Sequence, residues 1–202
     1  MKITSIKQQI RQQGRYSIFL EGKYAFSLSD SALLESKLVP GQELSPDEVS
    51  AFKQISVNDK LYNNTLRFIA LRPRSKWEIE TYLQRKKAST SLTESILNKL
   101  SKVDLINDQK FAQAFVDNRR LLHPSSRRKL TLELRRKNVD KDIIQEVVGN
   151  EPDEEHSALA DIIARKRRQT RYQDDLKLMQ YLARQGFSYG DIKAALQATQ
   201  ID

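Results

Sequence analysis

The stretch NDQKFAQAFVDNRRLLHPSSRRKLTLELRRKNV, residues 107–139, decides the fold. In its first half, Phe111, Phe115 and Arg119 recur every four residues, which places them on one face of a helix. Pro124 ends this helix, because the residue before a proline avoids the helical region. The second half carries leucines at helical spacing among many basic residues, which predicts a second helix.

Short polar side chains stand where these two helices begin and end. Asn107 or Asp108 can cap the first helix, and Ser125 or Ser126 can cap the second, because their side-chain oxygens accept unpaired backbone N–H groups. Asn138 can take the left-handed conformation that closes the second helix. The stretch is therefore predicted to be a helical hairpin with an apolar seam and a basic outer face.

Three motifs in this order resemble those of the RecX family, bacterial regulatory proteins that bind and modulate the RecA recombinase. The central one is Asp108-x-x-Phe111-Ala112-x-x-Phe115-Val116-x-x-Arg119. The first is Leu66-Arg67 followed by Arg74-Ser75-x-x-Glu78-Ile79-x-x-Tyr82-Leu83, and the last is Arg184-Gln185-Gly186-Phe187-Ser188-Tyr189-x-x-Ile192. Family members often carry glycine before and after the second central helix, where this chain has Ser125-Ser126 and Asn138.

The resemblance implies a monomeric, non-enzymatic regulator without cofactors. Such a protein binds the RecA filament on single-stranded DNA and inhibits its ATPase and strand-exchange activities, and it thereby modulates recombination, DNA repair and the SOS response. DNA, single- or double-stranded, is a second partner consistent with this role.

Composition limits the remaining possibilities. The chain has 202 residues, of which 30% are charged, and it has no cysteine. Disulfides, thiolate metal sites and thiol nucleophiles are therefore excluded. No apolar run approaches the ~18 residues of a membrane-spanning helix, and the N-terminus lacks the apolar core of a secretion signal. We expect a cytoplasmic protein.

The net charge of +9 is concentrated in the middle of the chain. Residues 61–150 carry 19 basic and 10 acidic residues, whereas residues 1–60 carry 8 and 7 and residues 151–202 carry 8 and 9. A local basic field favours an anionic partner, such as nucleic acid or an acidic protein groove. The alternative is a solvated helical surface without a partner.

The N-terminal segment has strand periodicity. Apolar residues alternate from Tyr16 to Leu28 around a turn at Glu21-Gly22, which predicts a β-hairpin. The stretch 3–10 is an ambiguous third strand, and 31–38 is a short helix. Ser45, followed by proline and by Glu48, marks a helix start with a capping box. That helix either continues to about residue 72 as one element or is interrupted near residues 58–64.

The rest of the chain repeats itself. Leu83, Leu134 and Leu182 end equivalent helices 51 and 48 residues apart, and a capping residue stands eight positions before each of them. A repeat of this length indicates stacked helical units. We expect a mainly α-helical, elongated and curved body of three-helix repeats after a small β segment. The expected boundaries are 1–44 for the β segment and 45–104, 105–150 and 151–202 for the repeats.

Catalytic and metal-binding chemistry are not indicated. The two histidines, His123 and His156, lie far apart in the sequence and show no ligand spacing. There is no Walker-type glycine loop, and Ser75 and Ser126 are expected to cap helices because no base accompanies either of them.

Basic residues that bracket the predicted helices are the candidate contacts. Six of the eleven residues from 127 to 137 are basic. At 100° per residue, Leu130 and Leu134 form the stripe expected to be buried. The opposite face carries Leu132 in the middle of Arg128, Lys129, Arg135 and Arg136. Leu132 is either a stray exposed leucine or a packing contact between arginines that reach carboxylates or phosphates. The candidate partner- or DNA-binding residues are Arg72, Arg74, Lys76, Arg85, Lys86, Arg120, Arg127, Arg128, Lys129, Leu132, Arg135, Arg136, Lys137, Arg165, Lys166, Arg167, Arg168, Arg171 and Arg184.

Some of these basic residues also have structural explanations. The run from Arg165 to Arg171 ends a helix that begins with the acidic residues 151–155, and the helix dipole alone accounts for that arrangement. Arg119 is expected to bury its stem, whereas Arg120 is expected to point outward. Trp77 is expected to be a core residue, with an exposed stacking residue as the alternative.

Two hypotheses remain, a regulator of the recombinase filament and a direct nucleic-acid-binding module without a recombinase partner. Steep salt dependence of free DNA binding would favour the second.

Overall fold

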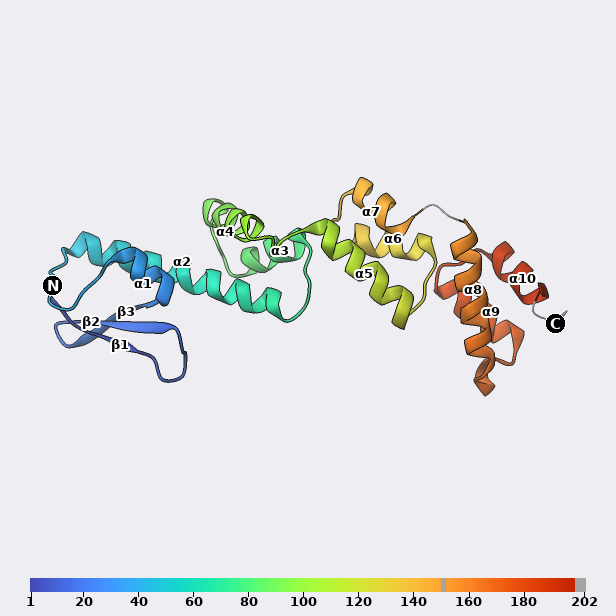
Figure 1. Cartoon of the computed structure of the whole chain (residues 1–202), viewed down its shortest axis with the longest axis horizontal. Coiled ribbons are helices and arrows are strands. Elements are labelled where there is room, and N and C mark those ends of the chain that lie inside the picture. Colours follow the sequence, from blue (N-terminus) through green and yellow to red (C-terminus); the bar gives the residue numbers. More distant parts are fainter. Residues whose placement is uncertain (150–151, 199–202) are drawn as a thin grey trace. The chain divides into compact units, whose positions relative to one another are not determined.

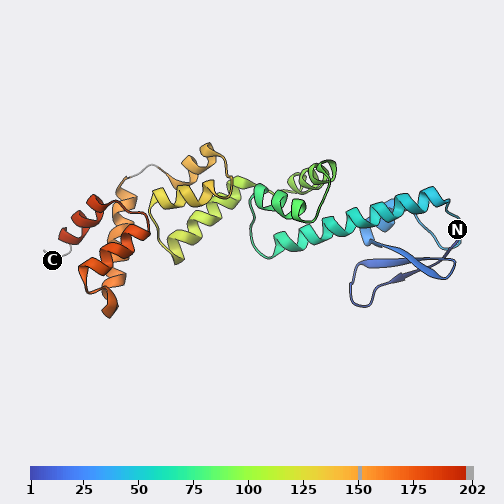
Figure 2. The same cartoon turned by 180° about the vertical axis from the view of Figure 1, so that it is seen from behind.

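The structure is a computed structural model that describes residues 1–149 and 152–198, and it divides into two compact units. The first unit comprises Met1–Arg72 and Tyr82–Lys99, and the second comprises Pro73–Thr81 and the chain from Leu100 onward. Helices dominate the described residues, and one small sheet lies near the N-terminus (Figure 1; Figure 2). The predicted fold class, mainly α with an N-terminal β segment, is confirmed.

The sheet has three antiparallel strands in the order β1-β2-β3, with β1 at Ile3–Gln8, β2 at Arg15–Leu20 and β3 at Lys23–Ser29. Glu21 and Gly22 form the predicted two-residue turn, both with positive φ, at 50° and 78°. This geometry matches the twist of the flanking strands. The ambiguous N-terminal stretch is the edge strand β1.

Helix α1, Asp30–Ser36, leads to α2, Pro46–Ala70, a single helix of 25 residues. The capping box is confirmed, since the Ser45 N–H donates to Glu48 Oε2 at 2.8 Å and the Glu48 N–H donates to Ser45 Oγ at 3.2 Å. The Asn58-Asp59 pair does not interrupt α2. The Asp59 carboxylate accepts hydrogen bonds from Arg15 and Ser29 of the sheet, so it does not compete for the helix backbone.

The inner face of the sheet packs against α2. The rings of Phe26 and Phe52 stack at 5.8 Å, and the buried core comprises Ile3, Ile18, Leu20, Phe26, Leu28, Leu38, Leu44 and Val49. Arg15 is buried beneath this contact, where it donates to Asp59 at 2.9 Å and to the Ser27 carbonyl at 2.9 Å. Loss of Asp59 would leave a buried cation without its ion pair, which costs about 3–5 kcal/mol.

Three groups of helices follow in repeated order. Repeat 1 is formed by α2, by α3, Lys76–Arg85, and by α4, Thr90–Lys102. Repeat 2 comprises α5, Asp108–Leu122, α6, Arg127–Arg135, and α7, Lys141–Val148. Repeat 3 comprises α8, Pro152–Arg167, the 3-10 turn η1, Thr170–Tyr172, α9, Asp175–Arg184, and α10, Tyr189–Ala198.

The repeats are in register. Helices α3, α6 and α9 begin 51 and 48 residues apart, and α4, α7 and α10 begin at the same spacings. Residues of positive φ follow the second helix at equivalent places, namely Lys87, Asn138 and Gly186. Equivalent positions can therefore be compared directly across the repeats.

Local signals within repeats 2 and 3 are confirmed. Asn107 caps α5, Ser126 caps α6 and Asp174 caps α9. Each repeat has its own core. The buried residues of repeat 2 are Phe111, Ala112, Val116, Leu130, Leu134, Val139, Ile144, Val147 and Val148. Those of repeat 3 are Leu159, Ile162, Ile163, Leu178, Leu182, Phe187, Ile192 and Leu196.

The expectation that Trp77 is a core residue was wrong, because its side chain is 40% exposed on the first turn of α3. Ile79, two positions later, is fully buried instead. The predicted acidic cap at residues 151–155 lies largely outside the described residues, and only Glu155 among its side chains is described.

Candidate partner-binding surfaces

The N-terminus of α3 docks onto repeat 2 at a contact that we call the first joint. Ser75 Oγ donates to the Lys137 carbonyl at 2.9 Å, and Lys137 Nζ donates to Glu78 Oε1 at 2.7 Å. The Lys76 N–H donates to Asp108 Oδ1 at 2.8 Å. The first N–H groups of a helix have no intrahelical acceptor, so the joint supplies one.

Helix α6 docks onto repeat 3 through equivalent residues at the second joint. The Ser126 N–H donates to the Gln185 carbonyl at 3.0 Å, and Lys129 Nζ donates to Gln185 Oε1 at 2.8 Å. The Arg127 N–H donates to Glu155 Oε1 at 3.1 Å. Helix α6 is thus held at its N-terminal end by repeat 3, and the turn that follows it is held by α3. A rigid element of this kind positions surface side chains accurately.

The two joint serines are almost completely buried, with Ser75 at 0% and Ser126 at 1% exposure. Sequence reasoning assigned them only as helix caps and missed their role between repeats. The available signal was their equivalent position in the repeat, 51 residues apart.

The predicted orientation of α6 is confirmed. Leu130 and Leu134 are buried, whereas Leu132 is 46% exposed. Arg128, Arg135 and Arg136 are exposed around Leu132, and within residues 1–149 and 152–198 their guanidinium groups make no hydrogen bond or ion pair. The outer face of α6 therefore presents one apolar side chain among three unneutralised cations.

Two of the predicted partner contacts in or next to α6, Lys129 and Lys137, make intramolecular contacts instead. Lys129 was expected on the outer face with the arginines, but its ammonium group donates to the Arg184 carbonyl at 3.2 Å and to Gln185. Lys137 is paired with Glu78 across the first joint. Both lysines reach over neighbouring helix ends because their long stems can lie along the surface.

The two adjacent arginines of α5 also make internal contacts. Arg119 Nε donates to Glu133 Oε2 at 2.9 Å, and its guanidinium lies 5.2 Å from the Phe115 ring centroid. The paired head and covered stem that the sequence predicted are confirmed. Arg120 is exposed, but its Nη2 donates to the Val148 carbonyl at 3.1 Å, so it lies across the end of α7.

A basic groove runs between α6 and α7, with a volume of about 390 Å³. Helix α6 contributes Arg127, Arg128, Thr131 and Arg135 to its lining, and the other lining residues are Lys141, Ile144, Gln145, Val148, Gly149 and Glu155. Among the residues that the structure describes, four basic residues and one acidic residue therefore line the α6–α7 groove. Lys141 was not among the predicted contacts, because its place beside α6 depends on how α7 packs.

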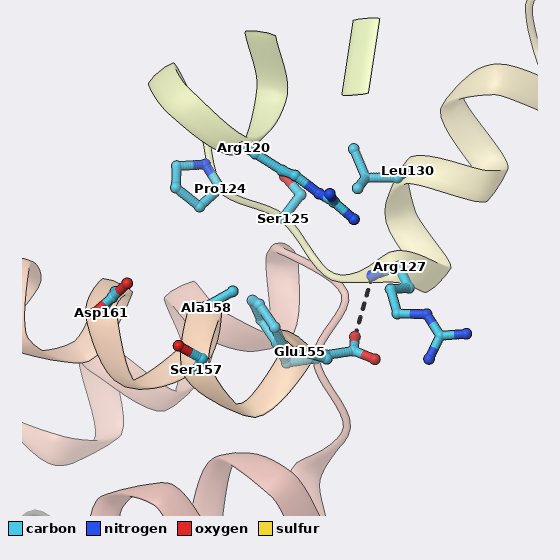
Figure 3. A pocket seen from close by; sticks show the side chains of 10 residues that line it. Arg120, Pro124, Ser125, Arg127, Leu130, Glu155, Ser157, Ala158 and Asp161 are labelled. Atoms are coloured by element: carbon cyan, nitrogen blue, oxygen red, sulfur yellow. Dashed lines mark hydrogen bonds between the residues drawn. The ribbon is translucent and has the colours of Figure 1, made fainter. Parts of the chain in front are cut away.

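A larger cavity, of about 570 Å³, lies at the second joint. Figure 3 shows Arg120, Pro124 and Leu130 on the repeat 2 side, and Ala158 and Asp161 of α8 opposite them. The Glu155 carboxylate points to the Arg127 backbone (Figure 3). Because acidic and basic side chains are balanced around this cavity, it shows no preference for an anion or a cation.

The basic run at the end of α8 divides into structural and exposed residues. Lys166 Nζ lies 5.1 Å from the Tyr172 ring centroid and 4.7 Å from that of Tyr181, a favourable cation–π arrangement. Arg167 is half-buried, donates to the Gln173 carbonyl at 2.7 Å and pairs with Asp175. The exposed candidates on repeat 3 are Arg165, Arg168, Arg171 and Arg184.

The candidate residues of repeat 1 do not belong to one compact unit. Arg72, Arg85 and Lys86 are exposed residues of the first unit, whereas Arg74 and Lys76 belong to the second. Lys86, directly after α3, has its Nζ 5.7 Å from the ring centroid of Tyr82 in that helix.

The described side chains include no group of three or more histidine, aspartate or glutamate residues that could hold a metal ion. Three pKa shifts have local causes. The Asp30 carboxylate raises the pKa of Tyr16, a hydrogen bond from the Ser45 backbone lowers the pKa of Glu48, and one from the Lys110 ammonium lowers the pKa of Asp104. Each is explained by a cap or a surface contact. None of the helices described is both long and apolar enough to cross a bilayer.

Comparison with family models gives three matches in order along the chain. Residues 1–45 match the regulatory protein RecX N-terminal domain, residues 107–148 match the second three-helix domain of RecX, and residues 153–196 match its third three-helix domain. The second and third matches coincide closely with repeats 2 and 3.

Curated relatives named Regulatory protein RecX match over most of the chain. The protein of Listeria welshimeri is 31% identical over 98% of this chain and 76% of the relative's length. That of Lactobacillus johnsonii is 31% identical over 76% of this chain, a match that covers only 56% of the relative. That of Lactobacillus delbrueckii is 28% identical over 96% of this chain and 73% of the relative.

Two solved structures share the fold. The crystal structure of a regulatory protein RecX is matched with a TM-score of 0.71 and 25% identity, over 97% of this chain and 98% of that one. RecX from Lactobacillus salivarius is matched with a TM-score of 0.59 over 72% of this chain and 97% of that one, at 23% identity. From the ordered domain matches and the Listeria welshimeri relative, which is 31% identical along nearly the whole chain, we conclude that this chain belongs to the RecX family.

Proposed function

We propose that this chain is a non-enzymatic regulator that binds the RecA recombinase filament on single-stranded DNA and inhibits ATP hydrolysis and strand exchange. It would act as a monomer in the cytoplasm, without a cofactor, and would modulate recombination, DNA repair and the SOS response. The observation that carries the proposal is the match to relatives named Regulatory protein RecX over 98% of the chain.

The outer face of α6 supports a protein partner for this role. Arginine is among the residues enriched at hot spots of protein interfaces, where neighbouring contacts exclude water from the patch. Leu132, 46% exposed between Arg128, Arg135 and Arg136, has that composition and is held on a helix whose ends are fixed by two joints. Several weak patches along a repeat protein add through their high effective concentration on a filament.

The proposal is tested by DNA-dependent ATP hydrolysis of the host's RecA, titrated with this protein while DNA is in excess. Replacement of Leu132 by glutamine should weaken inhibition by about tenfold or more, since one hot-spot residue contributes about 2 kcal/mol. The matched control is Leu176→Gln on α9, at a leucine that is 65% exposed. If the two substitutions weaken inhibition equally, α6 is not part of the contact with the recombinase.

Direct nucleic-acid binding is a second candidate function. The α6–α7 groove, with its four basic residues, is the observation that favours it. If phosphate contacts dominate, affinity for free DNA should fall steeply with salt. If protein contacts dominate, free DNA should bind weakly at physiological salt, whereas the recombinase should still bind.

A further inference from the structure

Three of the four cations that line the α6–α7 groove, Arg128, Arg135 and Lys141, are not required by the fold. Because the repeats are in register, each groove position has an equivalent in repeats 1 and 3. Arg128 corresponds to Trp77 in repeat 1 and to Leu176 in repeat 3. Arg135 corresponds to Gln84 and Ala183, and Lys141 corresponds to Thr90 and Tyr189, in the same two repeats. None of these six residues is charged, although all belong to helices of the same register. Arg127, the fourth cation of the groove, corresponds to Lys76 in repeat 1 and to Asp175 in repeat 3. Arg128, Arg135 and Lys141 are thus cations of repeat 2 alone.

Internal contacts do not account for these cations either. Arg128, Arg135 and Lys141 are exposed, and in the described part of the chain their charged groups make no hydrogen bond or ion pair. Three like charges along one groove repel each other, which opposes folding. A set of cations that the fold neither requires nor neutralises is best explained by an anionic ligand.

The spacing of the cations favours an extended ligand over a single ion. Arg128 and Arg135 lie seven residues apart on one helix, which corresponds to about 10 Å along its axis. Lys141 faces the same groove from the first residue of α7. The cations are thus spread along the groove and over both of its walls, an arrangement that matches a ligand with negative charges at intervals along its length.

Guanidinium groups match the geometry of phosphates, to which they can donate two parallel hydrogen bonds. None of the described residues that line the groove is aromatic, so they offer no platform on which bases could stack. Such a groove contacts the backbone and leaves the sequence unread.

We infer that the α6–α7 groove binds the phosphodiester backbone of one nucleic-acid strand, chiefly through Arg128, Arg135 and Lys141. The inference deepens the second candidate function and rests on it, because it assigns that function to a particular groove. Arg128 and Arg135 also flank Leu132 on the outer face of α6, but Leu132 does not line the groove. The Leu132→Gln variant therefore tests recombinase inhibition separately from strand binding in the groove.

The experiment measures the affinity of the full chain for a fluorescein-labelled oligo(dT) strand by anisotropy, over a series of salt concentrations and without recombinase. The test variant carries Arg128→Gln, Arg135→Gln and Lys141→Gln. Each lost phosphate contact lowers the salt slope by about 0.7, so the slope should fall by about 2 and the affinity at low salt by at least about tenfold. All three residues are exposed, so the variant is expected to fold, and its melting curve checks this.

The control variant removes the same amount of charge outside the groove through Lys102→Gln, Lys177→Gln and Lys193→Gln, which are also exposed and are not among the candidate contacts. The salt slope of this control variant should fall by at most half as much as the salt slope of the groove variant. Equal losses in the two variants would mean that only net charge matters and would overturn the inference. Displacement of the oligonucleotide by poly-glutamate at equal charge concentration would also overturn it, because the groove would then prefer acidic peptides.

Discussion

Gly186 is the position where the geometry of the second joint can be tested with one methyl group. The residue follows α9 with a φ of +93° and lies against the start of α6. A Cβ atom added here would come within 2.4 Å of Ser126 Oγ and 2.9 Å of Lys129 Cβ. Ser126 is buried and caps α6, so it has little room to move.

The cost of Gly186→Ala has two parts. A left-handed backbone costs an alanine about 1 kcal/mol more than a glycine. Overlap with a buried neighbour typically costs a further 1–3 kcal/mol, and displacement of Ser126 would also weaken its cap on Lys129. We expect the free energy of unfolding to fall by about 3 kcal/mol, measured by urea denaturation.

Substitutions at two other glycines distinguish the cost of the left-handed backbone from the cost of steric overlap. Gly22 also has a positive φ, of +78°, but a Cβ there would have no neighbour within 4 Å, so Gly22→Ala should cost only about 1 kcal/mol. Gly190 lies in α10, where the nearest atom would be 3.8 Å away, and Gly190→Ala should be neutral or slightly stabilising. If Gly186→Ala costs no more than Gly22→Ala, the close contact between α6 and α9 is refuted.

Three further predictions concern other contacts. The folded-state pKa of Glu48 is lowered, chiefly by the hydrogen bond from the Ser45 backbone, so its contribution to stability is present above the unfolded value of about 4.3 and is lost as pH falls through the folded value. The stability of the wild type should therefore drop more steeply with acid than that of Glu48→Gln, which has no carboxyl group to titrate, in urea titrations between pH 5 and pH 3. Lys137→Glu should destabilise the first joint by about 2 kcal/mol, because Glu78 is only 10% exposed, whereas Lys137→Arg should cost less than half of that in the same assay. The exposed Trp77 should be readily quenched by acrylamide, and a blue-shifted, protected emission would contradict its position.

Much of the fold follows from local signals. The ends of α5 and α6 could be predicted because Asn107 and Ser126 cap their own helices, and such contacts span only three residues. The turn at Glu21-Gly22 is likewise local, and the register of the repeats is visible as spacing. These features depend on chemistry within a few residues of each position.

Features that depend on distant residues could not be predicted. Asp59 looks like a helix breaker until Arg15, 44 residues away, is seen to hold its carboxylate. Ser75 contacts the Lys137 carbonyl 62 residues away, and Lys129 reaches Gln185 over 56 residues. The helical periodicity of α6 correctly separated buried from exposed leucines. It could not show which lysines form hydrogen bonds or ion pairs with a neighbouring repeat. Lys141 was missed for the same reason.

The proposed role is tested most directly by DNA-dependent ATP hydrolysis of the host's RecA, with DNA in excess so that competition for DNA is excluded. The account predicts inhibition at less than one molecule of this protein per recombinase subunit, with the Leu132→Gln variant at least about tenfold weaker than the wild type. A normal ATPase rate at saturating protein would contradict regulation of the filament.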